Sequence, residues 1–132
     1  MTDTFFPYRF DLRYAAMWAP FGARPGRDGV TVTDDSFRAT FGFLKLRTGR
    51  DNVIGGHITE NYRWYTAIGA RLSGADDGLT FGTNHDRGVC VHFRERVPRV
   101  VGARPHSALT VTVADCEALL EAIGQAPPRP AP

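Results

Sequence analysis

Apolar and polar residues alternate along much of the chain, and this alternation predicts short β-strands. Over residues 5–14, every even-numbered position holds a large apolar or aromatic residue, namely Phe6, Tyr8, Phe10, Leu12 and Tyr14. Residues 30–48 hold further alternating runs around a polar turn, and the apolar phase shifts by one residue near positions 42–44. A period of two is typical of a half-buried strand, and a phase shift indicates a bulge or bend. We therefore expect one strand over 5–14 and two or three over 30–48.

The middle of the chain has the same character. Val53–Thr59 is a weaker strand pattern that Gly55-Gly56 interrupts, and a final alternating run follows Leu109. Within residues 66–93, three alternating runs are separated by turn-rich breaks at 75–78 and 84–88. Runs of this length with Asx and Gly between them predict a three-stranded antiparallel meander.

One amphipathic helix is predicted near the C-terminus, at about residues 115–123. Asp115 is suited to the N-cap or first turn, and Gly124 supplies a stop. Its apolar stripe consists of Ala118, Leu119, Ala122 and Ile123. Residues 125–132 hold four Pro among eight positions, which predicts a disordered tail. The length of 132 residues predicts a single domain over 1–124.

These elements predict a mainly β fold with seven or eight antiparallel strands. The strands would form a curved sheet or open barrel capped by the C-terminal helix. No strand–helix–strand alternation occurs, which argues against a parallel sheet.

Charge and composition narrow the function classes. The net charge of +2 is too small to indicate a nucleic-acid partner, and no apolar run is long enough to span a bilayer. The N-terminus lacks a secretion-signal pattern, so we expect a cytoplasmic protein without integral membrane contact. Fifteen of the sixteen basic residues are Arg, a bias that a GC-rich genome explains.

Three motifs resemble the pleckstrin-homology-like superfold in its bacterial form, over roughly residues 30–124. They are F-x-x-T-F-G-F (37–43), A-I-G-A-R-L (67–72) and T-V-T-V-A-D-C-E-A-L-L-E-A-I (110–123). The resemblance implies a binding or assembly module and not an enzyme. The final helix lacks the Trp of many eukaryotic members, and Lys45, Arg47 and Arg50 match the family's basic cluster only loosely. The resemblance therefore does not imply that this chain binds lipid headgroups.

Candidate chemistry is sparse, and we expect no cofactor. Cys90 and His92 are two residues apart, so on a strand they share one face and could bind a metal or form a thiolate pair. A metal needs a third ligand, which the sequence does not indicate, so we predict no metal site and interpret the pair as facing solvent or an interface. His85 and Asp86 suit acid/base catalysis, and they also suit a tight turn.

The most unusual local mixture of aromatic and Arg residues lies at positions 62–71. Such a mixture is typical of binding hot spots, although it also suits packing against a barrel. Trp18 lies in a loop with Phe21, where the two rings either cover a pocket or plug the end of the barrel. The predicted contact residues are Tyr62, Arg63, Trp64, Arg71 and Trp18.

Three functions follow as hypotheses. The first is a non-enzymatic binding or assembly domain, with a protein partner or a homodimer favoured over a small molecule. The second is a small β-barrel that binds an apolar ligand, because many of the nine Phe fall on inward faces. The third is an enzyme that uses His85 or His92 with Asp86. Arg94, Arg96, Arg99 and Arg104 form the densest basic stretch, which could meet a phosphate or an acidic partner or be a solvated face.

Overall fold

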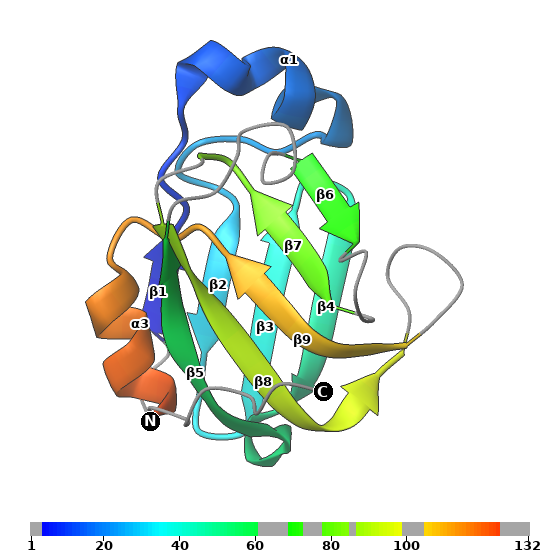
Figure 1. Cartoon of the computed structure of the whole chain (residues 1–132), viewed down its shortest axis with the longest axis vertical. Helices are drawn as coiled ribbons and strands as arrows, with labels where there is room; N and C mark the ends of the chain where they lie inside the picture. The colour runs from blue at the N-terminus through cyan, green and yellow to red at the C-terminus, as the bar shows by residue number, and fades with distance from the viewer. Residues whose placement is uncertain (1–3, 61–68, 73–77, 85–86, 99–104, 125–132) are drawn as a thin grey trace.

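Two β-sheets face one another in the computed structural model, which describes residues 4–60, 69–72, 78–84, 87–98 and 105–124. Within these residues the first sheet has the order β1-β2-β3-β4 and the second has β5-β8-β9-β7-β6 (Figure 1). The first sheet comprises β1 (Thr4–Pro7), β2 (Gly29–Val32), β3 (Ser36–Phe41) and β4 (Leu44–Gly49). The second comprises β5 (Val53–Glu60), β6 (Gly69–Leu72), β7 (Leu79–Gly82), β8 (Arg87–Val97) and β9 (His106–Val111).

The helices lie outside the two sheets. A short helical segment follows β1 and consists of η1 (Leu12–Tyr14), α1 (Ala15–Trp18) and η2 (Ala19–Phe21). One 3-10 turn, η3 (Arg50–Asn52), joins the sheets, and α3 (Cys116–Ile123) follows β9. The predicted mainly β class with a C-terminal helix is confirmed. No helix within the described residues is long and apolar enough to cross a membrane.

The core lies between the sheets and is rich in aromatic rings. Phe41 of β3 stacks on Phe81 of β7 with 5.3 Å between ring centroids, and Phe37 meets Phe93 of β8 edge to face at 6.2 Å. Both Phe37 and Phe41 are fully buried. Truncating a buried Phe to Ala typically costs about 3–5 kcal/mol, so these contacts across the sheets are a major source of stability.

The prediction of two or three strands over 30–48 is confirmed, because β2, β3 and β4 lie there. The phase shift near residues 42–44 is the tight turn between β3 and β4. Gly42 has φ +63°, and a Cβ at this position would lie 1.9 Å from the Phe21 carbonyl oxygen. The turn therefore requires glycine both for its backbone conformation and for the close approach of the η2 segment.

Two sequence predictions are wrong in detail. The strand expected over 5–14 ends at Pro7, because the Asp11 carboxylate accepts the Arg13 backbone N–H and starts η1. The meander expected over 66–93 is absent from the described residues. There β6 and β7 form an antiparallel pair, but β7 then pairs in parallel with β9, while β8 lies between β5 and β9.

Both predicted ends of the C-terminal helix are confirmed. The Asp115 carboxylate accepts the Ala118 backbone N–H at 3.0 Å, and Gly124 at the C-cap has φ +88°. The helix buries Cys116, Leu119 and Ile123. A Cβ at Gly56 would lie 3.1 Å from the Ile123 side chain, so the small residue on β5 lets α3 pack closely.

Candidate metal centre

A β-bulge at the start of β5 decides which of its side chains share a face with those of β8. Val53 pairs with Phe93, but the next pair joins Gly55 to His92, so Ile54 is the additional residue. Beyond the bulge, His57 pairs directly with Cys90. Without the additional residue, His57 would pair with Val89 and face the core, because a shift of one residue exchanges the two faces of a strand.

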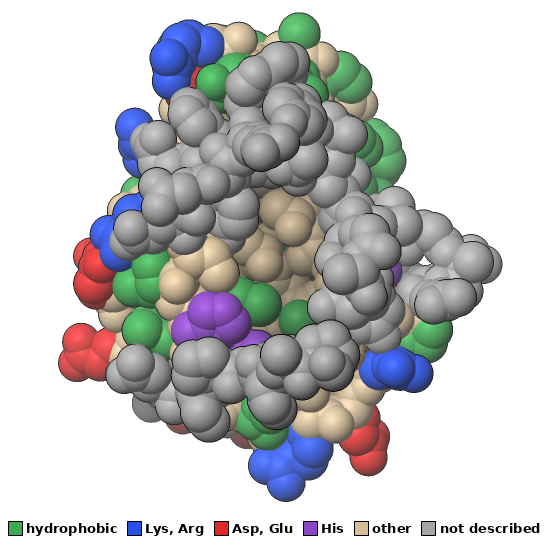
Figure 2. All heavy atoms as spheres, viewed as in Figure 1, with side chains coloured by type: hydrophobic (Ala, Val, Ile, Leu, Met, Phe, Trp, Pro, Cys, Tyr) green, Lys and Arg blue, Asp and Glu red, His purple; other side chains and the backbone are tan. Residues whose placement is uncertain are grey.

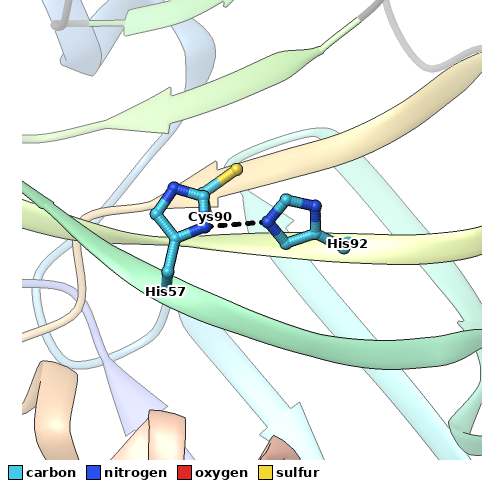
Figure 3. Close-up of side chains that lie close together, drawn as sticks. All are labelled: His57, Cys90 and His92. Atoms are coloured by element: carbon cyan, nitrogen blue, oxygen red, sulfur yellow. Dashed lines mark hydrogen bonds between the residues drawn. The ribbon is translucent and has the colours of Figure 1, made fainter. Parts of the chain in front are cut away.

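Three side chains with metal-binding atoms meet on the outer face of this strand pair. His57 comes from β5, and Cys90 and His92 come from β8 (Figure 3). Their candidate ligand atoms all lie within 4.8 Å of one another. Nδ1 of His57 lies 2.8 Å from Nε2 of His92, so one ring donates a hydrogen bond that the other accepts. His57 and Cys90 are half-buried, and His92 is buried.

The donor set is typical of zinc. Imidazole nitrogen and thiolate sulfur are the ligands of tetrahedral Zn²⁺ sites, with bonds of about 2.0–2.1 Å to nitrogen and about 2.3 Å to sulfur. Two nitrogen ligands in a tetrahedron then stand roughly 3.3 Å apart. The observed spacing of 2.8 Å between Nδ1 of His57 and Nε2 of His92 is a hydrogen-bond distance. An ion would therefore replace the shared proton and separate the two rings by about half an ångström.

Small side chains flank two of the three donors on the neighbouring strand β9. Thr110 of β9 pairs with Cys90, and Ala108 pairs with His92. The molecular surface is hollowed on this side of the second sheet, with histidine side chains at the edge of the hollow (Figure 2).

The placement of Cys90 and His92 on one face of a strand is confirmed, and the third donor is the residue that sequence reasoning missed. His57 precedes His92 by 35 positions and belongs to no motif with it. The only local signal was the Gly55-Gly56 pair, which marks the irregular start of β5. A long-range strand pairing is what joins the three residues.

Of the residues predicted for a contact surface, the structure describes only Trp18 in full. Trp18 ends α1 and is 5% exposed; its Nε1 donates to the Asp11 carbonyl oxygen at 3.1 Å, and its ring meets Phe10 edge to face. This placement favours the plug over the pocket cover. Arg71 belongs to β6, where its backbone pairs with Thr80 of β7, and its side chain is not among the described parts of the structure. Tyr62, Arg63, Trp64, His85 and Asp86 lie outside the described residues.

Part of the predicted basic stretch borders a cleft of about 450 Å³ at the end of β8. Arg94 and Arg96 are exposed there, with Glu95 between them. The Asn52 side chain fixes the backbone by accepting the Glu95 N–H and donating to its carbonyl oxygen. Arg99 and Arg104 lie outside the described residues.

No protein-family model, curated protein or solved structure matches the chain. The likeness to the pleckstrin-homology-like superfold therefore stays a prediction from sequence.

Proposed function

We propose that this protein is a metal-binding protein that holds one Zn²⁺ ion through His57, Cys90 and His92. The observation that carries the proposal is the convergence of two imidazoles and a thiol on one face of two paired strands. This proposal replaces the expectation from sequence that the protein binds no metal, because that expectation depended on the lack of a third ligand.

The residue types favour zinc over the harder divalent ions. Ca²⁺ and Mg²⁺ take oxygen ligands, and the cluster offers none. Thiolate and imidazole suit zinc and copper, and zinc needs no redox partner and accepts tetrahedral geometry readily. The thiol must lose its proton on binding, which makes uptake of the ion favourable at neutral rather than acidic pH.

The test is a competition titration of chelator-treated protein with Zn²⁺ against a chromophoric chelator. We expect one tight site per chain, and at least about a 100-fold loss of affinity in Cys90→Ser or His57→Ala, because even an outer-shell partner is worth about 10–100-fold. Cys116→Ala is the matched control, since it removes the other thiol, which is buried at the first position of α3. Wild-type affinity in both ligand variants would refute the site.

The wider expectation of a non-enzymatic binding or assembly domain is also kept as a proposal. Its support is the aromatic and Arg composition of Tyr62, Arg63, Trp64 and Arg71. A protein partner or a homodimer would use this segment. Size-exclusion chromatography and affinity capture with Arg63→Ala and Trp64→Ala test it, and an unchanged oligomeric state and unchanged partners would contradict it.

A further inference from the structure

We propose that the outer face of the first sheet, together with a cleft beside the β3–β4 turn, binds single-stranded nucleic acid. Five cationic residues make up what we call the basic face: Arg38, Lys45 and Arg47 on the strands, and Arg24 and Arg27 in the cleft. None of the five belongs to β5 or β8, which carry the candidate metal ligands, so the two sites are independent.

Strand alternation places three of these cations on the side of the first sheet that is turned away from the second. Arg38 of β3 and both Lys45 and Arg47 of β4 are exposed, whereas Phe37 and Leu46 on the same strands are buried. Successive residues of a strand point to opposite faces. The three cations therefore point outward from the sheet that lies behind β7, β8 and β9 in Figure 1.

Two of the cations stand directly opposite one another. Arg38 pairs with Arg47 across β3 and β4, and Lys45 lies two residues away on β4, at a spacing of roughly 7 Å. Directly opposed residues have Cβ atoms about 4.5–5.5 Å apart, and like charges in this arrangement destabilise a sheet. The fold therefore keeps three positive charges close together at a cost in stability, which a bound polyanion would offset.

A cleft of about 540 Å³ extends the basic face past the β3–β4 turn. Thr40 and Lys45 belong to both the sheet and the lining of the cleft, and Arg24 and Arg27 line it as well. Asp28 supplies one carboxylate to the lining. This side chain is 2% exposed, accepts the Arg24 backbone N–H at 2.7 Å and lies 3.4 Å from the Arg27 guanidinium. With three cations and one carboxylate, the lining of the cleft is positive.

The small net charge of the chain does not reflect this surface. The four strands of the first sheet, all of which the structure describes, contain no Asp or Glu. Asp34 and Asp35 of the β2–β3 turn and Asp51 of η3 lie beyond the strand ends opposite the cleft. Positive charge is therefore concentrated between the Arg38–Arg47 pair and the cleft. The expectation of no nucleic-acid partner depended on net charge alone, and this local distribution replaces it.

Two exposed aromatic rings border the basic face. Phe43 lines the cleft and is 69% exposed, and its backbone N–H donates to the Phe21 carbonyl oxygen at 3.0 Å. Phe5 on β1 is 43% exposed and lies in one row with Thr31 and Arg38. Surfaces that bind single strands without sequence preference combine cations along the phosphates with rings on which bases stack. The rings therefore favour nucleic acid over a polyanion without bases.

The first test is fluorescence anisotropy of labelled oligo(dT) and oligo(rU) of about 15 nucleotides with the full chain at low salt. We expect saturable binding that weakens with salt, with a log–log slope of up to about −3.5 if all five cations contact phosphates. The tighter of the two ligands identifies DNA or RNA as the source. Lack of binding to both would overturn the proposal, and binding to phosphatidylserine vesicles instead would assign the face to a membrane.

Charge reversal tests the location. Arg47→Glu should weaken oligonucleotide binding at least about tenfold, because it removes a phosphate contact and adds repulsion. It should also raise Tm by about 1–4 °C, since opposite charges then face one another across β3 and β4, and this rise separates the loss of binding from unfolding. Arg94→Glu makes the same change at an exposed position of β8 and should bind within about twofold of the wild type. Equal losses in the two variants would overturn the location.

A second pair of variants tests the role of the exposed ring. Phe43→Ala should weaken binding at least about fivefold, because a stacked base loses its platform. Leu12→Ala is the control, since Leu12 is 73% exposed in η1 and lies outside the basic face, and it should bind like the wild type. Wild-type affinity in Phe43→Ala, together with equally tight binding of heparin, would make this a general polyanion surface and overturn the assignment to nucleic acid.

Discussion

Zinc should raise the melting temperature of this protein without being needed for folding. The ligands stand on strands that pair through their own backbone hydrogen bonds, so the metal-free chain already presents the site. An ion that binds the folded state and not the unfolded state stabilises it by RT ln(1 + [L]/Kd), which is about 2.7 kcal/mol when free zinc is 100 times Kd.

The size of the chain converts this free energy into a temperature. Unfolding entropies average about 2.1 cal/mol/K per residue, which for 132 residues amounts to about 0.28 kcal/mol/K. The expected rise in Tm is therefore about 10 °C at that zinc concentration. Zinc binding to Cys and His of the unfolded chain would reduce this value.

Differential scanning calorimetry of chelator-treated protein, with and without zinc, measures the rise in Tm and shows whether the metal-free protein unfolds cooperatively. The metal-free protein should unfold in one cooperative transition, and zinc should move that transition upward. Cys90→Ser should keep the metal-free transition and lose most of the shift. A metal-free chain without a cooperative transition would refute the preformed site, and an equal shift in Cys90→Ser would place the zinc elsewhere.

Two further substitutions test how the fold supports the site and the core. Gly55 has φ +127°, so Gly55→Ala should strain the bulge by about 1–3 kcal/mol and weaken zinc binding while every ligand is kept. Calorimetry measures the loss of stability and zinc titration the loss of affinity. Unchanged zinc affinity would show that the bulge does not position the ligands. Burial, with a smaller contribution from the Asp28 charge, raises the pKa of Tyr8 well above 10.0, and its hydroxyl has no hydrogen-bond partner among the described residues. The neutral phenol is favoured in the fold, so this contribution to stability is complete below pH 10 and is lost as pH rises toward the raised pKa. In an alkaline titration followed by circular dichroism, Tyr8→Phe should therefore unfold at higher pH than the wild type. Its stability at neutral pH should change little. Identical alkaline midpoints for the two proteins would contradict this.

Much of the fold could be predicted from the sequence because its signals are local. The alternation over residues 30–48 predicted strands where β2, β3 and β4 occur, and the phase shift marked the Gly42 turn. Asp115 and Gly124 marked the ends of α3, since capping depends on neighbours within one turn.

Alternation did not reveal where a strand ends or which strand it joins. Tyr8, Phe10 and Tyr14 all contact the core, yet the chain leaves the sheet after Pro7. A bridge joins Tyr8 to Val113, and the Asp11 side chain then starts a helical turn. The pairing of β7 with β9 in parallel depends on how the whole sheet packs, and no short segment contains that information.

The candidate site also depends partly on local sequence signals and partly on the tertiary structure. The sequence by itself placed Cys90 and His92 on one face, because a strand repeats every two residues and both lie on β8. Only the tertiary structure brought His57 to them, through the pairing of β5 with β8. That pairing is set by the packing of two sheets and by one additional residue at Ile54, which turns His57 away from the core and toward the thiol.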